Sequence, residues 1–290
     1  SYLNAYSPLS RSLVVRKMLL AGLLTDTGRF RHADKGAFQT AVDVLTGDDL
    51  DYASFVEFVE SETILIGHDG RNTNMKKLDA VSSGIRNNGK SLLFVGLVPT
   101  DVIYSLSGLL NLPGVIITAS HNPKEYNGFK IVLNQDSFFG EDIKKLGRLA
   151  QKGHFQTYNG FSKHVTINER YIKRIIDPIK TINDRLVDKT IVWDCGNGAT
   201  GPSIEAVTKK ISGNHIVLYS NVDGNFPNHH PDPTDISTLK IMSDKMKEVN
   251  ADIGIGFDGD GDRCGVIDEK GNEIFSDKIG LLIACLLYTS

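Results

Sequence analysis

Short apolar runs alternate with amphipathic segments along most of this chain. Runs rich in β-branched and aliphatic residues predict strands over 63–68, 91–97, 114–118, 129–133, 190–194, 215–219 and 252–257. Segments with helical spacing of apolar residues predict helices over 75–88, 101–110, 141–151, 168–179, 201–211 and 236–248. Because strands that alternate with helices form βαβ units, this pattern predicts an α/β fold with mostly parallel sheets.

The pattern of strands and helices occurs twice. Residues 153–163 are polar and show no hydrophobic period, so we interpret them as a linker. We expect two successive domains over 1–155 and 156–268, each with a mixed, mostly parallel sheet flanked by helices. Residues 269–290 are predicted to begin a third domain.

The C-terminal segment contains an almost wholly apolar run over 279–287, shortly after Ser276 and Asp277. This run is too short to span a bilayer, and we interpret it as the start of a buried helix. An apolar helix needs another layer to pack against. We therefore expect the chain to be the N-terminal part of a longer protein.

The composition is typical of a globular protein of ordinary charge. Of the 290 residues 40% are apolar and 23% charged, and the net charge of −3 gives no electrostatic reason to expect nucleic acid as a partner. We expect no membrane partner either, because the apolar stretch over 18–24 is short and lacks the small-residue cleavage pattern of a secretory signal. The composition does not indicate an oligomeric state.

Three cysteines, Cys195, Cys264 and Cys285, are far apart and odd in number. Cys195 and Cys264 stand in apolar, strand-like surroundings. We predict that both are buried free thiols in a reducing compartment, which favours a cytoplasmic location.

An acidic loop follows the strand predicted over 252–257. Asp258, Asp260 and Asp262 alternate with glycines, which let the backbone turn tightly, and Arg263 follows them. Hard oxygen ligands grouped in this way suit Mg²⁺, which commonly bridges to a phosphate. The loop is therefore a candidate magnesium site.

A calcium-binding EF-hand is the closest alternative for this loop. Asp258, Asp260, Asp262 and Glu269 fall on positions 1, 3, 5 and 12 of such a loop. Position 6, however, is Arg263 where that turn requires glycine, and the flanking runs are strand-like rather than helical. We reject the EF-hand interpretation.

A second candidate segment closes the strand predicted over 114–118. Its sequence over 118–123 is TASHNP, in which Ser120 stands on a turn with His121 beside it. A serine in this position is often only a turn former, and a serine nucleophile needs activating partners. His121 offers a proton partner, and a hairpin at Asn127-Gly128 would return Lys130 to the site.

The two segments together indicate a phosphoryl-transfer centre with Ser120 as nucleophile. Both follow the carboxyl ends of strands, where α/β sheets bind their ligands. Three aspartates and a phosphoserine carry about five negative charges. Mg²⁺, Arg263 and Lys130 would supply four positive charges, so a metal ion is expected in the centre.

A glycine-rich turn offers an alternative function. Residues 196–201 match G-x-G-x-x-G, lie between a predicted strand and a predicted helix, and precede Asp223 by about twenty residues, as in dinucleotide-binding proteins. No group of residues suited to hydride transfer accompanies the motif, so we favour a tight strand-to-helix turn. A non-catalytic sugar-phosphate or dinucleotide-binding module remains the alternative.

His229 and His230, which are neighbours in sequence, are interpreted as part of a rigid, proline-rich loop rather than as metal ligands.

With these motifs, the chain resembles the α-D-phosphohexomutase superfamily, specifically its phosphomannomutase/phosphoglucomutase group, from about Ile64 to about Leu287. The resemblance rests on GHDGR at 67–71, TASHNP at 118–123 with NGFK at 127–130, DCGNG at 194–198, the loop over 224–233, and GFDGDGDR at 256–263.

The resemblance implies a phosphoserine enzyme, an intramolecular phosphotransferase that interconverts hexose 6-phosphate and hexose 1-phosphate through a hexose 1,6-bisphosphate. Phosphorylated Ser120 would give its phosphoryl group to the sugar, and Asp258, Asp260 and Asp262 would hold Mg²⁺ against the phosphoserine. Arg263 and Lys130 would steady the transferring group. A serine phosphatase is the nearest enzymatic alternative, and would release free phosphate instead.

Two departures from the family pattern affect what the chain is expected to do. Members usually carry a glycine-arginine phosphate loop near the N-terminus, for which Gly28-Arg29 is the nearest candidate. Members also have four domains, of which this chain resembles two and the opening of the third. We therefore expect these 290 residues alone to be at best feebly active, and the sequence does not choose between mannose and glucose.

Overall fold

The computed structural model describes residues 45–46, 63–133, 136–152, 160–167 and 169–289. The chain divides into two compact units. Among the described residues, the β2 unit contains 45–46, 63–119, 126–133, 136–152, 160–167 and 169–170, and the β9 unit contains 120–125 and 171–289. The domain boundaries expected at residues 155 and 268 remain predictions.

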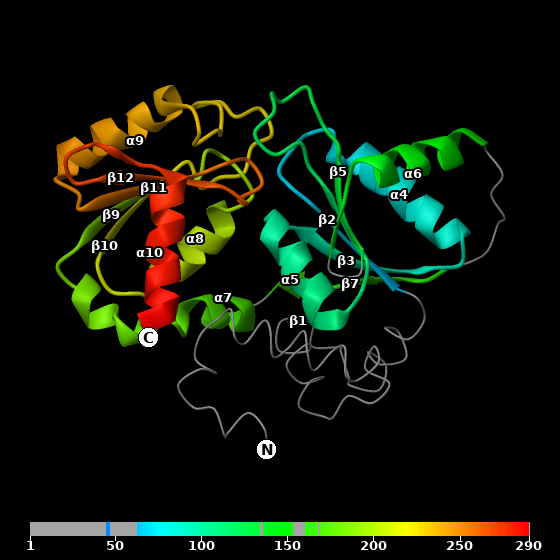
Figure 1. The fold of residues 1–290 in the computed structure, drawn as a ribbon, viewed down its shortest axis with the longest axis horizontal. Helices are drawn as coiled ribbons and strands as arrows, with labels where there is room; N and C mark the ends of the chain where they lie inside the picture. The colour runs from blue at the N-terminus through cyan, green and yellow to red at the C-terminus, as the bar shows by residue number, and fades with distance from the viewer. Residues whose placement is uncertain (1–44, 47–62, 134–135, 153–159, 168, 290) are drawn as a thin grey trace, which may run out of the picture. The chain divides into compact units, whose positions relative to one another are not determined.

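The β2 unit is built on a six-stranded mixed sheet in the order β6-β5-β4-β2-β3-β7 (Figure 1). Its strands are β2 (Thr63–His68), β3 (Ser91–Leu97), β4 (Gly114–Ile117), β5 (Phe129–Leu133), β6 (Asp136–Phe138) and β7 (Ser162–His164). Strand β2 runs parallel to β3 and β4, and β3 runs parallel to β7, whereas β4, β5 and β6 form antiparallel pairs. A short pair, β1 (Leu45–Thr46) with β8 (Thr166–Ile167), is antiparallel.

Helices α4 (Asn74–Asn87) and α5 (Thr100–Leu110) cover opposite faces of this sheet (Figure 1). Successive strand residues point to opposite faces, and β4 shows the consequence. Val115 packs with the cluster that contains Leu78 of α4, whereas a Cβ at Gly114 would lie 2.8 Å from Ile103 of α5. A further helix, α6 (Glu141–Lys152), follows β6.

The β9 unit is built on a five-stranded mixed sheet in the order β10-β9-β11-β12-β13. Its strands are β9 (Thr190–Asp194), β10 (Asn214–Leu218), β11 (Ile253–Phe257), β12 (Cys264–Asp268) and β13 (Glu273–Ile274). Strand β9 runs parallel to β10 and β11, and β11, β12 and β13 form antiparallel pairs. Its helical elements are α7 (Glu169–Ile176), η3 (Ile179–Thr181), η4 (Asn183–Leu186), α8 (Gly201–Thr208), α9 (Ile236–Val249) and α10 (Ser276–Thr289).

Helix α9 packs directly on the backbone of β11 because β11 presents glycines to it. A Cβ at Gly254 would overlap the sulfur of Met246, and a Cβ at Gly256 would lie 3.2 Å from Leu239. On the other side of the sheet, α7 packs on α8 through a buried aliphatic cluster (Figure 1). The end of β11, where the acidic loop begins, is therefore held by close contact with a helix.

The sequence predicted the longer strands and the α-helices of both units, with ends that differ by a few residues, but not the short strands β6 and β13. Two expectations about strand residues were wrong. Ser162 and Lys163, assigned to the linker, belong to strand β7, and Cys264 is exposed at the start of β12 rather than buried. Cys195 is buried as expected, and burial raises the pKa of its thiol to about 12.

The apolar run near the C-terminus is helical as predicted and lies in α10, but the expected burial was wrong, because Leu281, Leu282 and Ile283 are exposed. Among the residues that the structure describes, none of the helices combines the length and the apolar character that a bilayer crossing requires. The stretch over 18–24 and the candidate phosphate loop at Gly28-Arg29 lie outside the described residues.

Replacing Gly254 by alanine tests the contact between α9 and β11. We expect Gly254→Ala to lower the free energy of unfolding by about 1–3 kcal/mol, because the new methyl group must displace Met246 in a packed core. Gly280→Ala is the matched control: its Cβ would meet nothing within 4 Å on α10, so stability should stay equal or rise by about 0.5–1 kcal/mol. The measurement is urea unfolding followed by fluorescence of Trp193, the sole tryptophan. Equal stability of the two variants would contradict the contact.

Candidate functional site

The acidic loop joins β11 to β12 in an antiparallel hairpin, so the strands on which the EF-hand was rejected are confirmed. Asp258 and Asp260 are buried and Asp262 is exposed. One ligand atom from each lies within 4.8 Å of the others, and within the described residues this is the one group of three or more acidic, histidine or cysteine side chains placed so closely. These three oxygen donors could hold a metal ion.

The pKa of the Asp258 carboxyl group is strongly raised. Burial, and then the negative charges of Asp260 and Asp262, raise its pKa to about 7. Hydrogen bonds from the Ser120 hydroxyl and the Arg263 backbone N–H act in the opposite direction. A cation between the three carboxylates would remove the repulsion that makes ionised Asp258 unfavourable.

Ser120 lies against the acidic loop within the β9 unit. It is buried, and its Oγ donates a hydrogen bond to Asp258 Oδ2 at 2.7 Å. The backbone of Ser120 is left-handed, with φ of 52°, which is unfavourable for a residue with a Cβ. A Cβ at Gly259 would lie 2.8 Å from the Ser120 carbonyl oxygen, so the close approach of the two loops requires glycine there.

His121 and Arg263 extend this arrangement. Arg263 Nη1 lies 3.4 Å from His121 Nε2, and His121 Nδ1 lies 3.5 Å from Ser120 Oγ. Because a guanidinium only donates, the neutral ring must accept at Nε2 and carry its hydrogen on Nδ1. His121 then donates weakly toward Ser120, and the hydroxyl proton of Ser120 points at Asp258.

Lys130, the remaining predicted site residue, is half-buried on β5 in the β2 unit, where it pairs with Ile116. The antiparallel return from β4 to β5 that the sequence predicted is present. Asn127 and Gly128 do not form a two-residue turn, however, but end a longer loop between the two strands. The Asn127 side chain instead donates to Asn74 Oδ1.

The glycine-rich turn over 196–201 is packed against the acidic loop. Ala199 N donates to Gly259 O at 3.0 Å, and a Cβ at Gly198 would lie 2.8 Å from that same oxygen. The backbone N–H groups of 196–199 donate to Asp194, Tyr219, Cys195 and Gly259. Because these N–H groups already have acceptors in the protein, they are not arranged to bind a pyrophosphate.

A buried ion pair that the sequence analysis missed lies beside this turn. His229 Nε2 is 2.9 Å from Asp194 Oδ2, and His229 Nδ1 is 2.9 Å from the carbonyl oxygen of His230. Both neighbours only accept, so the arrangement favours a ring that carries hydrogen on both nitrogens, which is the charged form. Burial alone would lower the pKa of His229, but the hydrogen bond and charge of Asp194 outweigh it and raise the pKa. The two adjacent histidines were the feature of the sequence that could have indicated this ion pair.

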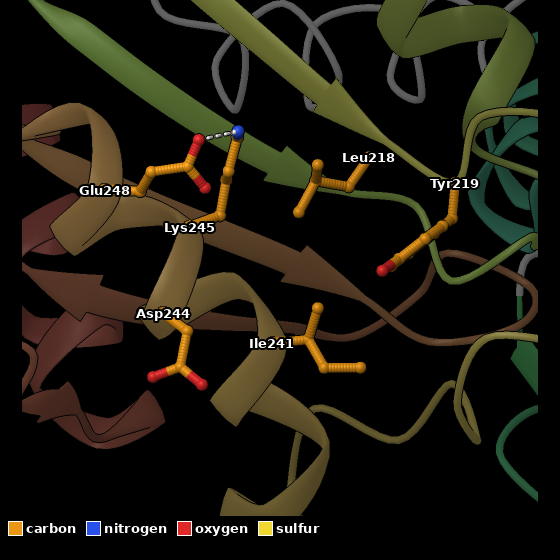
Figure 2. A pocket seen from close by; sticks show the side chains of 6 residues that line it. All are labelled: Leu218, Tyr219, Ile241, Asp244, Lys245 and Glu248. Carbon is orange, nitrogen blue, oxygen red and sulfur yellow. Dashed lines mark hydrogen bonds and ion pairs between the residues drawn. The ribbon is translucent and has the colours of Figure 1, made fainter.

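A hollow of about 360 Å³ lies between β10 and α9 (Figure 2). It is lined by Leu218, Tyr219, Ile241, Asp244, Lys245 and Glu248. Lys245 Nζ is 2.7 Å from Glu248 Oε1, so the lysine of the hollow is engaged by a neighbour on the same helix. None of the predicted site residues lines this hollow.

Two models of one known family match successive parts of the chain. Residues 52–157 match the family model described as phosphoglucomutase/phosphomannomutase, alpha/beta/alpha domain I, and residues 169–271 match the model of domain II. The chain belongs to the phosphoglucomutase/phosphomannomutase family. The resemblance inferred from the serine and acidic motifs is therefore confirmed.

Relatives of this family agree with the assignment. The chain is 39% identical to the phosphomannomutase/phosphoglucomutase of Pseudomonas syringae pv. tomato, over 76% of this chain and 47% of that protein. It is 36% identical to the phosphoglucomutase of Neisseria gonorrhoeae, over 76% of this chain and 48% of that protein. The crystal structure of a phosphoglucomutase/phosphomannomutase family protein from Burkholderia thailandensis superposes with a TM-score of 0.67 at 30% identity, covering 83% of this chain and 56% of that one. The chain thus spans about half the length of these relatives.

The raised pKa of Asp258 predicts how stability depends on pH without metal. The carboxyl has a pKa of about 7 in the folded state against 3.8 for a free aspartate side chain. The folded state therefore binds more protons, and stability falls as pH rises from about 4 to 7. Asp258→Asn removes the carboxyl group and with it this fall in stability at high pH. In EDTA at pH 8 we expect the variant to be more stable than the unmodified chain by on the order of 2 kcal/mol, with the difference gone near pH 4.

The measurement is urea unfolding at pH 4 and pH 8. Asp262→Asn is the matched control, and should gain less because its carboxylate is exposed and screened by solvent. A gain for Asp258→Asn that is the same at both pH values would contradict the predicted pKa.

Proposed function

We propose that this chain carries the phosphoserine and metal-binding parts of a phosphohexomutase that interconverts hexose 6-phosphate and hexose 1-phosphate. The observation that carries the proposal is the hydrogen bond from the buried Ser120 hydroxyl to Asp258 within a group of three carboxylates. Ser120 differs from an ordinary turn-forming serine because it is buried and because its hydroxyl donates to a carboxylate.

Asp258, Asp260 and Asp262 are the proposed ligands of Mg²⁺. Their oxygen atoms are hard donors, and their grouped charge together with the raised pKa of Asp258 favours a divalent cation. A bound Mg²⁺ would supply positive charge against the phosphoryl oxygens of a modified Ser120.

The other residues have distinct proposed roles. Arg263 offers a fixed positive charge at the rim of the loop, and its backbone N–H holds Asp258 Oδ1 at 3.1 Å. His121 lies between Arg263 and Ser120 and orients the hydroxyl. Lys130 is the further proposed contact for the transferring group. Such transfer depends mostly on positioning and charge, which is what these residues provide.

The proposed reaction moves one phosphoryl group out and another back. The bond between phosphorus and Ser120 Oγ breaks as a bond to a free hexose hydroxyl oxygen forms, and the hexose bisphosphate then returns its other phosphoryl group to Ser120. In the first transfer the attacking hexose hydroxyl loses a proton and Ser120 Oγ gains one as it leaves; the return transfer reverses both changes, so protons balance over the cycle. The net change is an isomerisation with no loss of phosphate.

A cytoplasmic location is proposed on the basis of the free cysteines alone.

The two alternatives are less well supported. A dinucleotide-binding module would need free N–H groups in the turn over 196–201, and those of 196–199 donate within the protein. A serine phosphatase would share the phosphoserine but pass its phosphoryl group to water. Release of free phosphate from hexose bisphosphate, leaving a hexose monophosphate that is not converted between its 1- and 6-phosphate forms, would favour the phosphatase.

Phosphopeptide mass spectrometry tests the proposed role of Ser120. After incubation of the 290-residue chain with glucose 1,6-bisphosphate and Mg²⁺, we expect phosphate on Ser120, and at least tenfold less when EDTA replaces Mg²⁺, because removal of the metal restores the repulsion between phosphoryl oxygens and carboxylates. Ser120→Ala should lose the modification.

Ser137→Ala is the matched control, because Ser137 is exposed on β6 and should not affect labelling. A chain whose Ser120 stays unmodified both as purified and after incubation would contradict the proposal, as would labelling that Ser120→Ala leaves intact.

A further inference from the structure

The segment that carries Ser120 begins at a buried carboxylate. Thr118 Oγ1 donates to Asp69 Oδ2 at 2.7 Å, and Asp69 N donates to Ile117 O at 3.1 Å. Thr118 N donates in turn to Gly128 O, on the far side of the loop. Asp69 follows β2 and is 1% exposed, so these bonds form away from competing water.

The other end of the segment returns to the same carboxylate through Arg71. The guanidinium donates from Nε to Asp69 Oδ2 at 3.2 Å and from Nη1 to the carbonyl oxygen of Tyr126 at 3.1 Å. Both side chains of this ion pair are fully buried. Breaking a buried pair by removing one partner is strongly unfavourable, so Arg71 is a firm anchor for Tyr126.

A second connection reaches the same end of the loop through asparagines. Asn74 Nδ2 donates to Asp69 Oδ1 at 2.7 Å, and Asn127 Nδ2 donates to Asn74 Oδ1 at 2.6 Å. Asn127 Oδ1 accepts from Gly128 N at 2.8 Å. Asp69 therefore connects to Thr118 before the segment and to Tyr126 and Asn127 after it.

The conformation of Ser120 explains why such anchoring is needed. A non-glycine residue with φ of 52° is in a sparsely populated conformation. Such a conformation persists only where the surrounding structure holds it, and it relaxes when the ends of its loop are free to move. The GHDGR motif of the sequence supplies Asp69 and Arg71, and the roles assigned so far leave both unused.

We propose that the Asp69–Arg71 pair is a positioning device that, with Thr118 and Asn127, pins both ends of the segment over 119–125 and thereby holds Ser120 in its left-handed conformation. The proposal rests on the proposed function, because positioning matters for reaction only where Ser120 carries the phosphoryl group. Asp69 and Arg71 are positioning residues and act on Ser120 through the backbone.

Trypsin cleavage after Lys124 tests the attachment without any ligand. Lys124 is exposed inside the pinned segment, and cleavage there requires the segment to open. Thr118→Val keeps the shape of the side chain but removes the hydrogen bond to Asp69. We expect cleavage after Lys124 to become about three- to tenfold faster, as the loss of one buried hydrogen bond implies.

Two controls separate local release from general loosening. Thr118→Ser keeps the hydroxyl and should restore slow cleavage, and cleavage after Lys270, in the exposed turn before β13, should not change. Asn127→Ala tests the other end of the segment and should also accelerate cleavage after Lys124. Unchanged cleavage after Lys124 in Thr118→Val, equal acceleration at Lys270, or failure of Thr118→Ser to restore it would each overturn the proposal.

The rate of Ser120 phosphorylation by glucose 1,6-bisphosphate gives the functional readout. Thr118→Val should lower the maximal rate about three- to tenfold with little change in the half-saturating concentration, because the nucleophile is misplaced while the ligand contacts stay intact. If Ser120 of the unmodified chain is never phosphorylated, the proposed function fails, while the cleavage experiment still decides whether the segment is pinned.

Discussion

Three buried carboxylates stand at the carboxyl ends of strands, and the way in which each is neutralised determines what the loops around it do. Asp69 follows β2 and pairs with Arg71, whereas Asp194 ends β9 and pairs with His229, whose pKa it raises. Asp258 follows β11 and has no such partner in the described part of the chain: it accepts from a hydroxyl and from a backbone N–H. Burying a carboxylate without a cation is costly. The two paired aspartates therefore act as anchors, and the third is the one that gains most from a metal ion.

The pattern of apolar and polar residues was sufficient to predict the strands that pack against helices on both faces. The buried strands β2, β3 and β9 were predicted with the bounds that the structure shows, because their apolar residues must meet helices on both faces. Strand β7 was missed because it is a short polar edge strand, added to β3 by backbone hydrogen bonds such as Leu92 N to Phe161 O. Bonds of this kind leave no mark on hydrophobic periodicity. Cys264 was misjudged for a related reason: it begins β12, next to Gly265, and one face of a strand end is open to solvent even inside an apolar run.

The candidate site divides in the same way between what the sequence could and could not show. Spacing alone placed Asp258, Asp260 and Asp262 in one group, since alternate residues of a single tight loop cannot lie far apart. It could not show the pair of Asp194 with His229, whose contact spans 35 positions and depends on how a loop folds back on β9. The G-x-G-x-x-G turn was ambiguous in sequence because the same glycines serve a nucleotide or a neighbouring loop. Counting the acceptors of its N–H groups decided between the two.

The left-handed conformation of Ser120 indicates what the anchoring by Asp69 would contribute to the proposed phosphoryl transfer. A flexible serine would reach its hydrogen bond with Asp258 only for part of the time, and the entropy of ordering it would add to the barrier of each transfer. If the loop is already fixed in the folded protein, the entropy of ordering Ser120 is lost during folding and does not add to the barrier of the proposed transfer. Under the proposed function, the strain at Ser120 would be offset by the bonds that hold both ends of its loop to Asp69, which is paired with Arg71. Separate aspartates for anchoring and for the proposed metal ion would then let the proposed nucleophile keep its position with or without the metal.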